Sequence, residues 1–425
     1  MDDSQAGLDG AACQGQIEKD FRWNFSVNLL EGAFFWFGLS FAASATILPL
    51  YVSHLTDSRV LIGLISAISG AGWYLPQLFT ANYVARLPVK KRMVIRVGLF
   101  SERLPLLVMA LSVFLFAARS PRVALVLFFC TLAWHTMGAG IIAIAWQDMI
   151  AKVIPVNYRG RLLGLANSAG SAAGILGAAL AVGILARFPF PTNFGVCISL
   201  TFLFVMASWF SLALTREPPS SPQRSSVSLS SYLRGLPGVL RQDRNFAAYL
   251  LSRIVVVFAK MGIGFVTVYA VQRWRLADSQ AGFYTIMLLA GETIANLVGG
   301  LAADRLGHKL VLEVGLILLT ICMLLVVIAP SPVWMYPVFA GIGGLIALDI
   351  LSGISLPMEF ANPEQRPTYI GLANTIPGLF AAVSPMIGGW LAARTSYVTL
   401  FLVSALLSAA AWAVLRWVVL EPRGR

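Results

Sequence analysis

The sequence is poor in charge. Only 12% of its 425 residues are charged, and Asp and Glu together number 19. An ordinary soluble domain carries about 25% charged residues. The mean hydropathy is +0.78, and hydrophobic residues make up 58% of the chain. This composition excludes a globular enzyme, a nucleic-acid binder and a disordered chain, and it leaves a polytopic protein embedded in a lipid bilayer.

Cysteine and histidine are also scarce. The four cysteines and three histidines are scattered, without the spacing of metal ligands or of a disulfide framework, so we expect no metal and no cofactor. No Gly-rich phosphate loop and no Ser/His/Asp constellation occurs, which argues against an ATP-driven pump and against a membrane enzyme. The first twenty residues are polar and rich in acids, so no cleavable signal peptide is predicted there.

Long apolar runs dominate what remains. A membrane helix needs about 20 mostly apolar residues, and twelve segments meet this condition. They cover residues 25–53, 60–85, 93–117, 122–147, 160–186, 190–214, 245–271, 280–303, 309–329, 333–358, 367–391 and 396–420. We therefore predict an all-α membrane protein with twelve transmembrane helices.

The one long polar gap divides these spans six plus six. The predicted parts are a tail (1–22), a first six-helix lobe (23–214), a linker (215–244), a second lobe (245–421) and a short tail (422–425). Twenty of the 31 Lys and Arg residues lie on the side that holds both termini, and seven lie on the other side. The positive-inside rule then predicts cytoplasmic termini and linker, in a cell membrane such as a bacterial inner membrane.

The two halves repeat each other. Asn24 matches Asn245 at an offset of 221, and Gly164-Leu165-Ala166-Asn167 matches Gly371-Leu372-Ala373-Asn374 at an offset of 207. Several landmarks occur in the same order, each at the same place relative to a span. Two pseudo-symmetric six-helix bundles are typical of transporters, whose site lies near the midplane between them.

One loop has a specific pattern. Gly300-Leu301-Ala302-Ala303-Asp304-Arg305-Leu306-Gly307-His308-Lys309 resembles the G-x-x-x-D-R-x-G-R/H-K signature of the major facilitator superfamily. The resemblance covers about residues 20–421. It implies alternating access, a central cavity for a small-molecule substrate, and a signature loop that locks the lobes in the outward-facing state. We expect a monomer.

The resemblance and the repeat together give a set of gating residues. These are Arg86, Asp148, Arg159, Gly300, Asp304, Arg305, Gly307 and Arg366. Gly300 is expected to permit close helix approach and Gly307 a tight turn. The first half departs from the signature, because Ala81 and Ala85 stand where Gly and Asp are required. The Gly-Pro of the drug-antiporter signature is also missing, so no subfamily is assigned.

Charges inside the spans are candidate functional residues, because each costs about 2.5–3.5 kcal/mol to insert. Arg253 and Lys260 are seven residues apart and share one helix face with Tyr249. This stripe is expected to face the cavity, or alternatively to be neutralised within its own lobe. Since Glu31 aligns with a position beside Arg253, a Glu31–Arg253 bridge between the lobes is a further prediction.

The remaining candidates are polar residues near mid-span. Asn28, Gln77, Glu292, Asn296 and Asp349 join the stripe as substrate or coupling residues. Glu292 is favoured over Asp349 as the proton-coupling acid, because it lies nearer mid-span. His135 is interpreted as a packing residue, and the adjacent Glu102 and Arg103 as structural or gating.

These features predict a secondary active transporter of a small organic solute, coupled to protons. Arg253 and Lys260 point to an anionic or zwitterionic group on the substrate. The alternatives are a uniporter and, from another class, a non-transporting receptor or a lipid scramblase. Mid-span acids and bases on both lobes favour the transporter.

Overall fold

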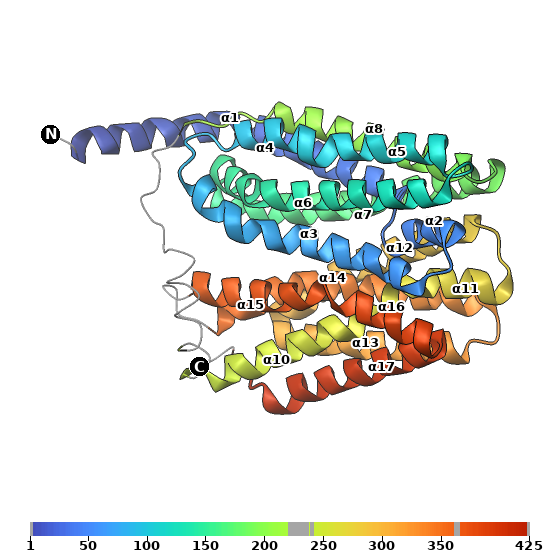
Figure 1. Cartoon of the computed structure of the whole chain (residues 1–425). Coiled ribbons are helices and arrows are strands. Elements are labelled where there is room, and N and C mark those ends of the chain that lie inside the picture. Colours follow the sequence, from blue (N-terminus) through green and yellow to red (C-terminus); the bar gives the residue numbers. More distant parts are fainter. Residues whose placement is uncertain (1–2, 220–237, 239–241, 361–365, 423–425) are drawn as a thin grey trace.

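The protein is a bundle of helices in two lobes, one for each half of the chain (Figure 1). The computed structural model describes residues 3–219, 238, 242–360 and 366–422, and these ranges contain no β-strand. The helices of the first lobe are α1 (Asp3–Ser40), α2 (Ile47–Leu55), α3 (Arg59–Ala85), α4 (Lys91–Gly98), η1 (Leu99–Arg103), α5 (Leu104–Phe116), α6 (Pro121–Val153), α7 (Val156–Arg187) and α8 (Thr192–Ala213).

The second lobe follows the same plan with more interruptions. Its helices are α10 (Arg244–Ala259), η2 (Lys260–Phe265), α11 (Val266–Trp274), α12 (Ser279–Leu306), α13 (His308–Ile328), η3 (Pro332–Trp334), α14 (Met335–Glu359), α15 (Arg366–Ala381), α16 (Ser384–Arg394), α17 (Tyr397–Ala413) and η4 (Val414–Val418). The predicted boundary of the lobe at residue 245 lies next to the start of α10. Most of the predicted linker lies outside the described residues.

Eleven helical segments of the described residues are long and apolar enough to cross a membrane. The prediction of an all-α membrane protein is confirmed, and the count differs from twelve for a physical reason. The predicted span 25–53 is occupied by the end of α1 and by α2, which are separated by a break from Phe41 to Thr46. Neither piece alone supplies a long apolar helix there.

The internal repeat is visible in matching hydrogen bonds. Asn24 donates to the carbonyl of Arg216 (2.9 Å) and accepts from its N–H (2.8 Å). In the second lobe Asn245 donates to the carbonyl of Leu420 (3.0 Å) and accepts from its N–H (2.7 Å). Each asparagine thus ties its lobe's first helix to the chain that leaves the lobe's last helix.

In the first lobe this tie positions the next residue of the chain, the buried acid Glu217. The side chain of Glu217 is fully buried and accepts from the N–H groups of Lys90 (3.0 Å) and Lys91 (2.7 Å), where α4 begins. It also pairs with Lys152 at 3.0 Å, at the end of α6. A carboxylate satisfies the free N–H groups at the start of a helix. Its negative charge is also stabilised by the positive end of the helix dipole.

Glu217→Ala is expected to destabilise the first lobe by about 3–5 kcal/mol, because it leaves Lys152 and two helix N–H groups without their buried partner. Thermal unfolding of the purified protein measures this effect. Asp148→Ala is the matched control, since Asp148 pairs with the neighbouring Lys90 through a half-exposed side chain. Equal unfolding temperatures for the two variants would contradict the assignment.

The first helix of each lobe is interrupted at the equivalent place. The break from Phe41 to Thr46 corresponds, at the repeat offset, to η2 (Lys260–Phe265), where α10 gives way to a 3-10 turn. Short 3-10 stretches inside longer helices often mark functional positions, and discontinuous helices supply polar groups to transporter sites. Both breaks therefore indicate that the functional site is to be sought between the lobes.

The lobes touch mainly at one end of the molecule. Both termini lie at the opposite end, which we call the terminal side, and the end that holds α2 and α11 is the far side (Figure 1). The interface joins α12 to α7 and α3 to α15 and α16. Gly63 and Gly70 of α3 lie against Pro385 and Ala381, so these contacts are close backbone approaches.

Further contacts on the far side come from polar residues. The Thr46 and Thr285 hydroxyls are 2.6 Å apart, and Thr267 donates to the carbonyl of Ala45 at 3.3 Å. His54 lies 3.0 Å from Asp278. Each of these contacts joins one lobe to the other.

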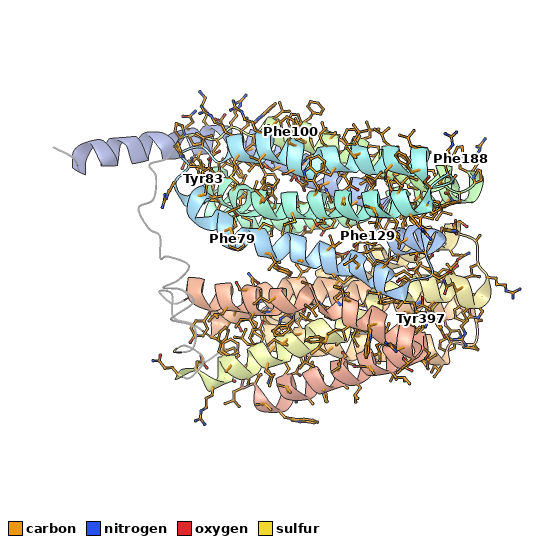
Figure 2. The ribbon with its side chains drawn as sticks, in the orientation of Figure 1. Phe79, Tyr83, Phe100, Phe129, Phe188 and Tyr397 are labelled. Carbon is orange, nitrogen blue, oxygen red and sulfur yellow. The ribbon has the colours of Figure 1, made fainter. Side chains whose placement is uncertain are left out.

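Toward the terminal side the contact between α3 and the second lobe ends. Tyr74 still packs against Gly378 of α15, but Phe79 and Tyr83, one and two turns further on, are 73% and 60% exposed (Figure 2). The lobes are therefore in close contact on the far side, whereas the last two turns of α3 present exposed aromatic side chains.

Candidate substrate site

Three charged residues meet inside the second lobe. Arg253 of α10 donates through Nη1 to Oδ1 of Asp349 on α14, and Lys260 donates through Nζ to Oδ2 of the same carboxylate. Arg253 and Lys260 are about 10 Å apart along the helix axis, so their long side chains converge from two directions on one acid. We call Arg253, Lys260 and Asp349 the charge triad. It has two positive charges and one negative charge.

The charge triad lies at the break in the helix. Lys260 is the residue where α10 ends and η2 begins. The side chains of Arg253 and Asp349 are 17% and 13% exposed, and that of Lys260 is 29% exposed. Of the two cations, Lys260 is therefore the one more accessible to a ligand.

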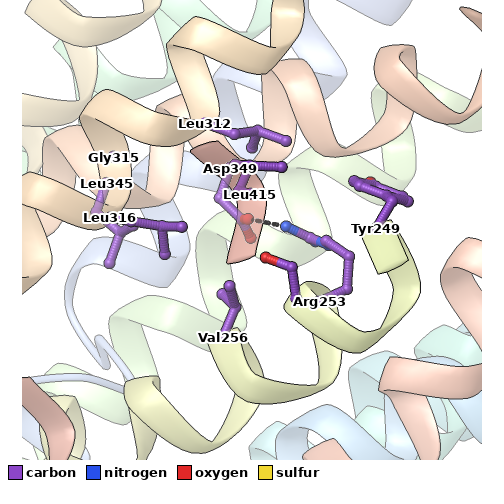
Figure 3. Close-up of a pocket in the computed structure, with 10 residues that line it drawn as sticks. Tyr249, Arg253, Val256, Leu312, Gly315, Leu316, Leu345, Asp349 and Leu415 are labelled. Carbon is purple, nitrogen blue, oxygen red and sulfur yellow. Dashed lines mark hydrogen bonds and ion pairs between the residues drawn. The ribbon is translucent and has the colours of Figure 1, made fainter. Parts of the chain in front are cut away.

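A small pocket borders the Arg253–Asp349 pair (Figure 3). Its other walls are mostly apolar and come from α10, α13, α14 and η4. The lining residues are Tyr249, Ser252, Arg253, Val256, Leu312, Gly315, Leu316, Leu345, Asp349 and Leu415. The pocket lies within the second lobe. Buried Tyr249 closes one side and donates to the Gly353 carbonyl at 3.5 Å.

One residue of the first lobe lies within electrostatic range of the charge triad. Tyr74 of α3 interacts electrostatically with both Arg253 and Asp349, although it belongs to the opposite lobe. Its Cβ would lie 3.0 Å from a Cβ added to Gly378, so a side chain at Gly378 would crowd it. The sequence analysis did not select Tyr74. One signal in the sequence could have indicated Tyr74. It lies three residues before Gln77, on the face of α3 that meets the second lobe.

The first lobe has a charged cluster of its own. Arg103 pairs with the adjacent Glu102 inside the π-helical turn η1, and both are buried. Glu31 accepts from Ser208 at 3.3 Å and interacts electrostatically with Arg103. His135 contacts the Glu102 carbonyl at 2.6 Å, as expected of a satisfied packing residue.

The predicted Glu31–Arg253 bridge is not formed in this structure. Arg253 is paired with Asp349, and Glu31 is held by Ser208 within its own lobe. The alternative reading of the sequence, that each cation is neutralised inside its own lobe, describes the charge triad correctly. The repeat alignment gave the depth of Glu31 and Arg253 but carried no information about which acid lies beside each cation.

The other candidates are dispersed. Asn28 is buried and donates to the carbonyl of Asn24 (2.7 Å) and to Thr215 (3.2 Å), so it belongs to the tie between α1 and the chain after α8. Gln77 donates to the Trp73 carbonyl of its own helix at 2.7 Å. Neither residue is brought to the charge triad by these bonds.

Glu292 and Asn296 lie half-buried on α12. Within the described residues, the Glu292 carboxylate makes no hydrogen bond or ion pair. The sequence favoured Glu292 as the coupling acid, but in this structure the acid that pairs with Lys260 is Asp349.

The predicted gating residues are only partly described. Gly307 adopts a φ of 92°, which confirms the tight turn, because such a backbone conformation favours glycine. Gly300 faces open space, so the close helix approach expected there is absent from this structure. Arg86 and Arg305 are exposed, and Asp148 pairs with Lys90 at 3.3 Å. The side chains of Arg159, Asp304 and Arg366 lie outside the described part of the structure.

The repeated lobes and the apolar spans define a multi-pass membrane protein. Residues 249–425 match the sequence profile of the Major Facilitator Superfamily. The second half of the chain is therefore similar in sequence to this superfamily, and nearly the whole chain is similar in fold to solved transporter structures.

Two solved structures illustrate the likeness in fold. One is the xylose transporter XylE from E. coli, in a partially occluded inward-open conformation. It has a TM-score of 0.65 and 15% identity, and the match covers 95% of this chain and 98% of that one. The other is the human organic anion transporter MFSD10. It has a TM-score of 0.60 and 15% identity, and the match covers 93% of this chain and 99% of that one.

A relative by sequence is the cis,cis-muconate transport protein of Acinetobacter baylyi. It is 22% identical over an alignment of 277 positions, and the alignment covers 61% of this chain. The match spans 64% of that relative's length.

Proposed function

We propose that the protein is a secondary active transporter that carries a small organic anion across a cell membrane by alternating access, as a monomer. The observation that supports this most directly is the composition of the charge triad, in which two cations share one carboxylate at a helix break. The excess positive charge lies in a membrane-spanning region, where an unneutralised charge is costly. A carboxylate on the substrate would neutralise it through charge-assisted hydrogen bonds.

The two relatives named for anions are consistent with this proposal. One is a muconate transport protein and the other an organic anion transporter. Muconate is a dicarboxylate with an apolar centre, and the charge triad likewise lies beside an apolar wall. The proposed substrate is therefore a carboxylate attached to a small unsaturated or otherwise apolar skeleton.

The proposed orientation puts the terminal side in the cytoplasm, because Lys and Arg are concentrated there. The structure then corresponds to an inward-facing state, since the lobes are closed on the far side. We further propose that transport is coupled to protons, with Asp349, Glu292 and Glu31 as the candidate acids. A uniporter would use the same charge triad without a proton.

A substrate panel in proteoliposomes tests the proposed function. Purified protein is reconstituted, and uptake of labelled cis,cis-muconate, benzoate, xylose and uridine is measured with and without an imposed pH gradient. Uptake of the two carboxylates, accelerated by an inward proton gradient, is the expected result. Uptake of xylose or uridine with no uptake of either carboxylate would contradict the anion proposal, and carboxylate uptake that ignores the gradient would favour the uniporter.

The signature loop yields a gating prediction. Asp304→Asn is expected to shift the protein toward inward-facing states, because it removes the acid of the complete signature in the second half. Arg86→Gln is expected to have a smaller effect, since the first-half signature has lost its Gly and Asp. Labelling of single cysteines from each side of the membrane measures the shift, and equal effects at Asp304 and Arg86 would refute the asymmetry.

A further inference from the structure

The far side of the molecule holds an ion pair between the lobes that the proposed function does not use. Nε2 of His54, near the end of α2, lies 3.0 Å from Oδ1 of Asp278, the residue just before α12. Asn193 of α8 donates to Oδ2 of the same carboxylate at 3.4 Å. His54 and Asn193 belong to the first lobe and Asp278 to the second, so this carboxylate is held from across the interface. We call these three residues the far-side lock.

We infer that the far-side lock depends on pH: a proton on His54 holds the lobes together on the far side, and loss of that proton favours their separation. Histidine is the side chain whose charge ordinarily changes between about pH 5 and pH 8. The inference rests on the alternating access of the proposed function, but not on the identity of the substrate. In the proposed orientation the far side faces the outside of the cell, so the far-side lock responds to external pH.

Aromatic neighbours fix the direction of the His54 ring. Phe190 stacks on the imidazole with the ring centroids 4.9 Å apart, and the Phe194 centroid lies at 5.6 Å. A protonated ring always donates from Nε2 and carries a full charge, whereas a neutral ring donates only as the tautomer with its proton on Nε2. The closed far side therefore binds the proton of His54 more tightly than an open far side does. Because of this difference, acid favours closure.

The presence of a histidine at this place is informative, because arginine is abundant around it. In the described chain, the helix ends and loops of the far side contain seven arginines but only two carboxylates, Asp57 and Asp278. The repeat aligns Asp57 with Asp278 and His54 with Arg275, all at the offset of 221. The first lobe thus offers a titratable group to Asp278, where the second lobe has a cation that keeps its charge at every physiological pH.

His54 is the group whose residue type changes charge in this pH range, among the described residues at the far-side end of α2 and of the helices packed against it. The other charged or titratable groups there are Tyr51, Asp57, Arg59, Arg122, Tyr269, Arg273 and Arg275. Tyrosine, aspartate and arginine ordinarily keep one charge state between about pH 5.5 and pH 8. Arg59 also joins the lobes, since it donates to the Ala392 carbonyl and its Cζ lies 4.3 Å from the centroid of the Tyr397 ring. That contact uses a permanent cation, so the pH response is expected from His54 alone.

The separation of the lobes on the far side tests the inference directly. In a background without the four native cysteines, Ala118→Cys in the first lobe and Val333→Cys in the second carry spin labels at exposed far-side positions. Pulsed electron paramagnetic resonance measures the distance between the labels in purified protein without substrate. From about pH 5.5 to about pH 8, the ratio of open to closed forms is expected to rise about two- to fivefold, the effect of a partly exposed ion pair.

Two substitutions of His54 are expected to act in opposite directions. His54→Gln has no charge and should give the distance distribution of high pH at both pH values. His54→Arg supplies a permanent cation and should give the distribution of low pH at both values. Both variants are expected to fold, because the His54 side chain is 34% exposed. Identical distributions for the two variants would overturn the inference.

Asp57→Asn is the matched control. It removes the exposed carboxylate that the repeat aligns with Asp278, on the same side of the molecule, and should leave the pH response unchanged. A response that persists in His54→Gln, or one that disappears in Asp57→Asn, would also overturn the inference.

Counterflow exchange of labelled cis,cis-muconate separates this inference from the proposed function. At about pH 8 on both sides of the membrane, His54→Arg is expected to exchange about two- to fivefold more slowly than His54→Gln. Label distances that change with pH in a protein that exchanges no carboxylate would overturn the proposed substrate and support the far-side lock. Exchange by a protein whose label distances ignore pH would overturn the far-side lock alone.

Discussion

Arg253→Met is expected to reduce carboxylate transport by about 10- to 150-fold, the equivalent of roughly 1.5–3 kcal/mol for a hydrogen bond to a charged group. The substitution removes one of the two cations and leaves a neutral Lys260–Asp349 pair, so the excess charge that attracts an anion disappears. Methionine fills a similar volume. The guanidinium Nε of Arg253 is buried without a partner, so no hydrogen bond is lost there. The variant should therefore fold. Initial rates of labelled muconate uptake, normalised to reconstituted protein, measure the effect.

Two further variants sharpen this prediction. Arg253→Lys keeps the charge but loses the planar fork, and a partial recovery is expected. Arg416→Met is the matched control, because Arg416 pairs with Glu313 at 3.5 Å through a side chain that is 54% exposed. Its uptake should stay close to that of the wild type. If Arg253→Met transports muconate as well as Arg416→Met does, the charge triad is not the anion site.

The sequence alone was sufficient to predict the helical two-lobe architecture. The length and hydropathy of a segment are strong indicators of a membrane span. The reason is that lipid offers no hydrogen bonds, so every backbone polar group must be satisfied within a helix. The repeat was readable from single residues, and Asn24 and Asn245 indeed make the same backbone contacts in their two lobes. The common face of Tyr249, Arg253 and Lys260 followed from helical periodicity alone.

The pairing of the charges was less predictable. Periodicity places Arg253 and Lys260 on one face, but the acid that lies between them comes from α14, almost a hundred residues later. The break from Phe41 to Thr46 was also missed, since that stretch contains neither Gly nor Pro. In η2 the glycines Gly262 and Gly264 were an available signal. Long-range packing decides both features, and a single sequence carries little information about it.

Locking the far side is expected to stop transport. Thr46 and Thr285 come from opposite lobes, are almost fully buried, and have hydroxyls 2.6 Å apart. Thr285 donates to the Ala281 carbonyl, so Thr46 is the donor between the two hydroxyls. Side chains in such contact bring their Cβ atoms near the roughly 3.5–4.5 Å that a disulfide spans. In a background without the four native cysteines, Thr46→Cys/Thr285→Cys should lose uptake almost completely on oxidation and regain it with reductant.

The physical reason is that alternating access requires the far side to open, whereas a covalent bond between α12 and the break before α2 holds it closed. The single variants Thr46→Cys and Thr285→Cys should be unaffected by oxidation. The pair Val257→Cys/Ser384→Cys is the control for cross-linking as such, because Ser384 donates to the Val257 carbonyl at 2.8 Å within one lobe. Oxidising that pair constrains no movement between lobes and should leave uptake unchanged. Continued uptake by the cross-linked Thr46/Thr285 pair would mean that the far-side contacts stay closed throughout the cycle, and it would rule out a rocking movement of the two lobes about the site.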